Sequence, residues 1–246
     1  MVFNITECVD FHHGKRIVIT ILVCGHDVVI IMHKEGDALL IQQPVYYPFR
    51  EVIEDNGRIF VNNQLHYEDG KYTIDFEDFE KKIVDNNVKV FILCNPHNPV
   101  GRVWTKEELE KMGDICLKHN VVIMDDEIHC DFTYPGFKFT SFMTLDEKYH
   151  NSLVLYTSPS KTFNVAGLQP ANIIIKNPEL RAAYRKANAA AGYSQGSIMG
   201  QVAVKSVYTK GDEWVNELVE YITGNMNYMR DFLKEYFPKA QFVDPE

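Results

Sequence analysis

Three mainly apolar segments, each followed at once by a polar cluster, constrain the possible fold of this chain most strongly. Residues 88–93, 121–124 and 152–157 have the length and composition of buried strands. Amphipathic helical patterns separate them, and strands that are apolar on both faces are typical of parallel sheets covered by helices. The alternation therefore predicts an α/β fold, a mostly parallel sheet with helices on both faces.

Further elements extend this pattern on both sides of the three segments. Residues 38–42, 58–64 and 172–175 are predicted strands, and residues 178–191, 197–208 and 212–236 are predicted helices. Asp75 is a suitable N-cap for a helix that starts at Phe76, and Thr105 with Glu108 forms a capping box for another. No internal repeat interrupts the alternation.

Composition and charge exclude several classes of function. The 246 residues carry a formal net charge of −9, which gives no electrostatic reason to bind nucleic acid or an anionic membrane. Five cysteines without a C-x-x-C pair argue against a disulfide framework or a zinc site, and fit a reducing cytoplasm. Four metal-ligand candidates near the N-terminus lack zinc-site spacing: His12, His13, Cys24 and His26. The apolar stretch 17–32 is too short and too interrupted for a membrane span.

Three polar residues follow the three strands: Asn98, Asp126 and Lys161. The carboxyl ends of parallel strands meet at one edge of the sheet, where functional groups gather. A lysine in a turn rich in Ser and Thr can form a Schiff base, and an acid nearby can pair with a pyridinium nitrogen. Singly, each of these residues is more often structural, as a surface charge, a cap or a turn residue. Their joint placement favours a pyridoxal 5′-phosphate (PLP) site.

Four motifs in order resemble those of fold type I PLP-dependent enzymes of the aminotransferase class I/II superfamily. They are P-V-Y-Y-P-F at 44–49, N-P-H-N-P-V-G at 95–101, D-E-I-H at 126–129 and S-P-S-K-T-F at 158–163. The resemblance extends from residue 34 to the C-terminus. It implies the large domain of that fold and PLP as cofactor.

Two positions narrow the resemblance to the C–S lyase branch, which includes cystathionine β-lyase and cystalysin-like enzymes. His129 stands where most aminotransferases of this superfamily have Tyr, and Gln169 stands where they have Arg. The branch implies β-elimination of cystathionine or cysteine S-conjugates to thiol, pyruvate and ammonia. Two alternatives stay open, a PLP-dependent aminotransferase and a catalytically inactive fragment that acts only as an interaction remnant.

The resemblance also implies roles for individual residues. Lys161 holds the cofactor covalently and then moves the Cα proton, and Asp126 keeps the pyridine nitrogen protonated. Asn98 donates to the ring O3′, Tyr46 stacks on the ring, and Tyr47 lies near the substrate.

Three further residues of the motifs receive cofactor-binding roles from the resemblance. Ser158 and Ser160 are phosphate-ligand candidates, and His129 lies near O3′, although a histidine at a strand end is about as often structural. The resemblance implies a small-molecule substrate, an amino acid, and it implies no metal. A homodimer with active sites at the subunit interface is also implied.

The expected domain organisation follows from where the resemblance starts. Residues 1–33 match no expected segment, residues 34–210 form a partial PLP-binding large domain, and residues 211–246 form a connecting helix and the start of a small domain. We expect a fragment of a disrupted gene, without the phosphate-binding turn and the small-domain arginine that clamps the substrate carboxylate. These two losses are expected to impair the orientation of the substrate and the affinity for the cofactor.

Overall fold

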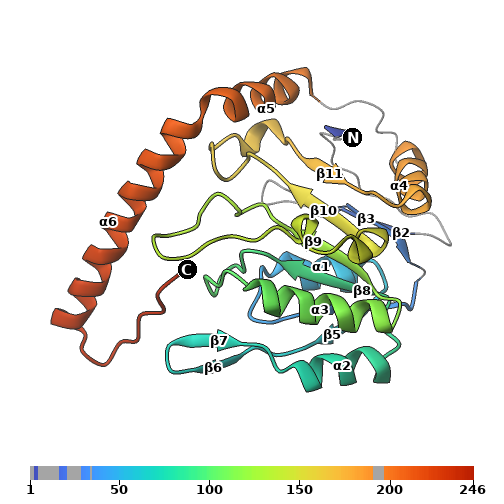
Figure 1. The fold of residues 1–246 in the computed structure, drawn as a ribbon, viewed down its shortest axis with the longest axis horizontal. Helices are drawn as coiled ribbons and strands as arrows, with labels where there is room; N and C mark the ends of the chain where they lie inside the picture. The colour runs from blue at the N-terminus through green and yellow to red at the C-terminus, as the bar shows by residue number, and fades with distance from the viewer. Residues whose placement is uncertain (1–2, 5–16, 21–28, 34, 191–196) are drawn as a thin grey trace.

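The computed structural model describes residues 3–4, 17–20, 29–33, 35–190 and 197–246, and a seven-stranded sheet lies at its centre (Figure 1). The strand order is β1-β11-β10-β9-β8-β4-β5. The bounds are Phe3–Asn4 (β1), Ala38–Ile41 (β4), Ile59–Asn62 (β5), Val90–Cys94 (β8), Val122–Asp126 (β9), Leu153–Thr157 (β10) and Asn172–Ile174 (β11).

Most neighbouring strands in this sheet are parallel. The pairs β5–β4, β4–β8, β8–β9 and β9–β10 are parallel, whereas β11 runs antiparallel to β10 and β1 antiparallel to β11. In register, Cys94 lies opposite Asp126, and Asp126 lies opposite Tyr156. The central strands therefore end level with one another, and the predicted mostly parallel sheet is confirmed.

Alternate side chains of the strands enter two cores, one on each face of the sheet. Phe49 and Ile53 of α1 (Pro48–Asp55) and Tyr184 of α4 (Pro178–Ala190) pack in one core. Phe79 of α2 (Phe76–Asp85) and Leu109 of α3 (Lys106–Lys118) pack in the other. Helices thus cover both faces, as the sequence predicted.

Local sequence signals placed most elements within a few residues. The helix caps at Asp75 and Thr105 are present, and the Thr105–Glu108 capping box is complete. The sequence did not predict α1, which begins at Pro48 inside the P-V-Y-Y-P-F motif, or the hairpin of β6 (His66–Glu68) and β7 (Lys71–Thr73). Within the segment left unassigned, β1 joins the sheet, and β2 (Ile17–Thr20) pairs with β3 (Val29–His33).

Two helices lie beyond the sheet, α5 (Ile198–Lys210) and α6 (Asp212–Tyr236). The long α6 has no buried residue, and the side chains of Tyr221 and Tyr228 are each 70% exposed. After α6 the chain runs back towards the sheet, so that its last residues lie near the ends of the central strands (Figure 1). This helix therefore has no core face within the described chain.

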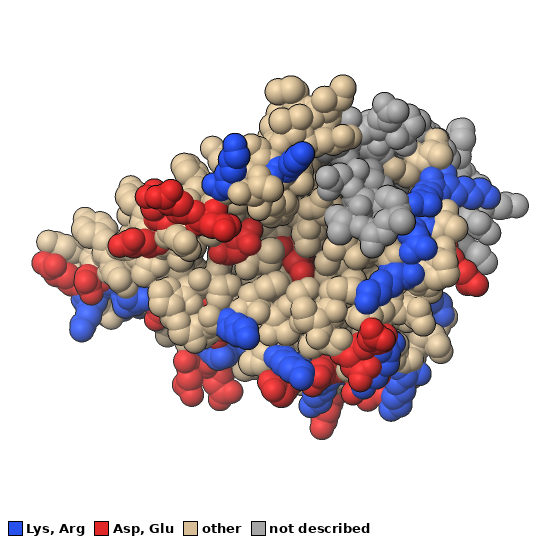
Figure 2. Space-filling model, turned by 45° about the horizontal axis from the view of Figure 1, so that its top comes forward, with Lys and Arg blue, Asp and Glu red and all other residues tan. Residues whose placement is uncertain are grey.

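Charged side chains are unevenly distributed over the face of the molecule that Figure 2 shows. In Figure 2, Lys and Arg side chains gather on the side of α4, and Asp and Glu side chains gather on the side of α6. Within the described ranges, no helix has both the length and the apolar character needed to cross a membrane.

The cap of α3 gives a direct test of the local structure. The Thr105 hydroxyl accepts a hydrogen bond from the Glu108 backbone N–H at 3.2 Å. Replacing Thr105 by Ala is expected to lower the free energy of unfolding by about 1 kcal/mol, whereas Thr105→Ser retains the acceptor and most of the stability. Urea unfolding of the three proteins measures this, and equal losses in both variants would contradict the role of the hydroxyl.

Candidate active site

Backbone hydrogen bonds join the segments that follow the three central strands. The Asn95 N–H donates to the Asp126 carbonyl at 3.0 Å, and the Glu127 N–H donates to the Tyr156 carbonyl at 2.9 Å. The chain leaves β8, β9 and β10 at the same edge as a result. Asn98 follows β8, Asp126 is the last residue of β9, and Lys161 follows β10, so all three predicted residues come where the chain leaves this edge of the sheet.

Asp126 ends β9 as a buried carboxylate, and its Oδ1 accepts a hydrogen bond from the Ile128 N–H at 3.2 Å. Burial raises the pKa of Asp126 to about 7, and the Ile128 N–H and the positive charge of Lys161 oppose this rise. The half-buried Lys161 therefore lies close enough to act on Asp126 electrostatically. Such a carboxylate favours a bound cationic group, since a positive partner offsets the cost of its burial.

His129, three residues after Asp126, also lies within the electrostatic reach of Lys161. Burial and, to a smaller extent, the charge of Lys161 lower the pKa of His129 to about 4. The imidazole is consequently neutral at physiological pH and can accept or donate a hydrogen bond. The charge of Lys161 acts on both Asp126 and His129, so the lysine lies near both residues, and their predicted roles stay predictions.

The turn that carries Lys161 is held by several hydrogen bonds. The buried Ser158 and Ser160 hydroxyls lie 2.8 Å apart, and the Ser158 hydroxyl also donates to the Pro170 carbonyl. On the other side of the lysine, the Thr162 hydroxyl donates to Asp131 at 2.7 Å. The two serines thus shape the turn, and their predicted contact with phosphate stays a prediction.

Trp214 of α6 also reaches this turn, since its indole N–H donates to the Thr162 carbonyl at 3.1 Å. The sequence did not identify Trp214 or Asp131 as site residues. No motif of the sequence marks either residue. The contact shows that α6 fixes the lysine turn from outside the sheet.

His97 links the Asn98 turn to the aromatic motif. Its Nε2–H donates to the Pro44 carbonyl at 3.0 Å, and burial lowers the pKa of His97 to about 4, so that the ring stays neutral. Next to Pro44, the half-buried Tyr46 ring packs edge-on against Phe49 at a centroid distance of 5.8 Å. Tyr47 is 67% exposed. The stacking and substrate roles of Tyr46 and Tyr47 remain predictions.

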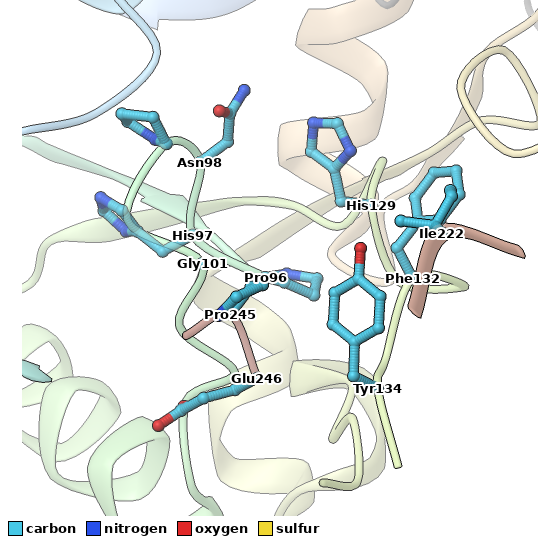
Figure 3. Close-up of a pocket in the computed structure, with 11 residues that line it drawn as sticks. Pro96, His97, Asn98, Gly101, His129, Phe132, Tyr134, Ile222, Pro245 and Glu246 are labelled. Atoms are coloured by element: carbon cyan, nitrogen blue, oxygen red, sulfur yellow. The ribbon is translucent and has the colours of Figure 1, made fainter. Parts of the chain in front are cut away.

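A cavity of about 340 Å³ opens between the Asn98 turn, the segment after β9 and α6. Figure 3 shows Asn98 and His129 on one side of this cavity and Tyr134 on the other. The lining residues are Pro96, His97, Asn98, Pro99, Gly101, His129, Phe132, Tyr134, Ile222, Pro245 and Glu246. Two predicted site residues, Asn98 and His129, therefore share one cavity with the C-terminal segment.

No three His, Cys, Asp or Glu side chains come together to hold a metal ion in the part of the chain that the structure describes. The N-terminal candidates His12, His13, Cys24 and His26 lie outside the described residues.

Comparisons with known proteins give the same family as the motifs. The family model for aminotransferase class I and II matches residues 24–246, which starts earlier than residue 34. The cystathionine β-lyase PatB of Bacillus subtilis is 43% identical over 211 residues, covering 86% of this chain. Cystalysin from Treponema denticola, solved with pyridoxal 5′-phosphate, has a TM-score of 0.81 at 40% identity and 84% coverage of this chain.

A C–S lyase from Staphylococcus hominis, solved with PLP and the inhibitor L-cycloserine, has a TM-score of 0.81 at 33% identity. The match covers 96% of this chain and 60% of that chain. This chain spans about half the length of the curated relatives it matches, 54% of PatB, and it covers 52% of the cystalysin chain.

The raised pKa of buried Asp126 predicts how the stability of the ligand-free protein depends on pH. Its folded pKa of about 7 exceeds the value of about 4 expected when unfolded, so the folded state loses stability as pH rises between these values. Asp126→Asn removes the carboxyl that must ionise at high pH. It is therefore expected to raise the free energy of unfolding by roughly a few kcal/mol at pH 8 and to change it little at pH 4.

Chemical unfolding at pH 4, 6 and 8 measures this difference, with exposed Asp55→Asn as the matched control. The same gain at every pH, or none relative to Asp55→Asn, would show that the Asp126 carboxyl is not held at the raised pKa.

Proposed function

Because this chain belongs to the aminotransferase class I and II family, we propose that it binds pyridoxal 5′-phosphate and forms the cofactor-binding part of a carbon–sulfur lyase. The proposed reaction is β-elimination from an amino acid with a thiol leaving group on Cβ, such as cystathionine or a cysteine S-conjugate. The observation that carries the proposal is the group formed by Lys161, buried Asp126 and neutral His129.

The residues fit this cofactor in three respects. Lys161 supplies a primary amine for covalent attachment, on a turn that Thr162 and Trp214 fix in place. The Asp126 carboxylate is buried and suits a protonated ring nitrogen. Asn98 on the neighbouring turn carries an amide that can donate to the ring oxygen.

When bound, PLP supplies an electron-accepting ring that stabilises negative charge at the Cα atom of an amino acid. The buried Asp126 carboxylate would keep the ring nitrogen protonated, and its low-dielectric surroundings would strengthen this pairing. Lys161 Nζ would hold the cofactor and would serve as the base for the Cα proton. Tyr46 would hold the ring, and His129 and Asn98 would supply hydrogen-bonding groups for its oxygen.

The overall change breaks the Cβ–S bond and the Cα–N bond of the substrate. The substrate R–S–CH2–CH(NH3⁺)–COO⁻ and one water give the thiol R–SH, pyruvate and ammonium. Similarity to cystathionine β-lyases and C–S lyases supports this reaction over amino-group transfer. His129 and Gln169 at the two branch-specific positions favour the same choice.

The first test is the visible absorption of the purified chain with PLP, beside Lys161→Ala. A band that needs Lys161 is expected, because free PLP and a Lys161-bound form absorb differently. The same spectrum in both proteins would contradict cofactor attachment at this lysine.

The second test is product release. With cystathionine and no added keto acid, pyruvate and a thiol are expected in equal amounts. Amino-group transfer that requires a keto acid would support an aminotransferase instead. No turnover by a chain that shows the Lys161 band would mean that this part binds the cofactor without catalysing the reaction.

A further inference from the structure

The C-terminal residue of the chain returns to the Asn98 turn through a buried carboxylate. Glu246 is only 8% exposed, although 144 positions separate it from the residue it pairs with, Arg102. Its Oε2 accepts hydrogen bonds from Arg102 Nε at 2.8 Å and from the Val103 N–H at 3.0 Å. Its Oε1 lies 2.8 Å from Lys71 Nζ. Burial raises the pKa of Glu246, but Lys71 and Arg102 hold it below its usual value.

Arg102 is a fixed anchor for this carboxylate. Its side chain is 3% exposed, and its Nη2 donates to both carboxylate oxygens of Glu108, at 3.0 and 2.9 Å. The guanidinium also donates to the Tyr72 carbonyl and lies 4.7 Å from the Trp104 ring centre. A guanidinium held on several sides keeps little freedom, so Glu246 binds a preorganised partner.

The backbone of the same residue fixes the turn itself. The Glu246 N–H donates to the Gly101 carbonyl at 2.7 Å. The turn is closed by the His97 N–H, which donates to the Arg102 carbonyl at 2.7 Å, and by the Gly101 N–H, which donates to the His97 carbonyl at 2.8 Å. Asn98 lies within this turn, so Glu246 holds the part of the turn that follows Asn98.

Pro245 packs directly on the turn. A Cβ atom at Gly101 would lie 2.8 Å from the Pro245 Cβ, so the two residues touch only because position 101 is glycine. Figure 3 shows Pro245 beside Pro96 at the cavity, with the Glu246 side chain directed away from it. The carboxylate therefore acts from behind the cavity wall rather than inside the cavity.

We propose that Glu246 is a positioning residue, which holds Pro245 as one wall of the cavity and fixes the Asn98 turn for the cofactor. This inference rests on the proposed function, because the turn is assigned to PLP there. Glu246 touches neither the cofactor nor the substrate in this account, and it acts through Arg102, Gly101 and Val103.

The test compares Glu246→Ala and Glu246→Gln with Glu235→Gln, an exposed residue of α6 with the same charge change. PLP affinity is measured by titrating the absorption band that depends on Lys161. Glu246→Ala is expected to bind PLP about tenfold more weakly, the scale of one lost charge-assisted hydrogen bond. Glu246→Gln keeps an acceptor for the Val103 N–H and is expected to lie between Ala and the parent.

Hydrogen–deuterium exchange of the peptide 95–104 gives a readout independent of the cofactor. Faster exchange at Val103 and in the turn is expected in Glu246→Ala, and unchanged exchange would overturn the proposal. A Glu246→Ala protein that is less stable but binds PLP as the parent does would also overturn it, since Glu246 would then be only structural. If the parent shows no Lys161 band, the proposed function fails, and the exchange result alone decides whether Glu246 fixes the turn.

Discussion

The burial of both faces of the central strands determines where the chemistry of this protein can lie. Strands β8, β9 and β10 are covered by helices on each side, so their polar residues are confined to the strand ends. Asp126 shows the constraint most clearly, because it closes a buried strand with a carboxylate that burial holds near pKa 7. A cationic partner at this edge lowers the cost of that charge, and Lys161 and a pyridinium nitrogen are both suited to the role.

The edge is then shaped by contacts from distant parts of the chain. Trp214 of α6 holds the lysine turn through the Thr162 carbonyl, and His97 ties the Asn98 turn to the Pro44 carbonyl. Glu246 fixes the part of the same turn that follows Asn98, through Arg102. Residues separated by much of the sequence thus set the positions of groups that the motifs supply.

The sequence predicted the alternation of strands and helices because buried strands and capped helices have strong local signals. Asp75 and Thr105 marked helix starts correctly. Asn98, Asp126 and Lys161 were predicted as site residues from their places after strands, and their roles stay predictions. Helix α1 was missed because its first residue belongs to a motif rich in proline and tyrosine. Asp131, Trp214 and Glu246 were missed because their roles depend on tertiary contacts, which no local pattern encodes.

We infer that the ends of three parallel strands form one PLP site around Lys161. The most direct measurement is reduction of the PLP-treated chain with borohydride, followed by peptide mass spectrometry to locate the attached pyridoxyl group. The account predicts attachment concentrated at Lys161, and much less of it in Asp126→Asn. Labels spread over exposed lysines such as Lys106 and Lys118, with Lys161 unmodified, would contradict it.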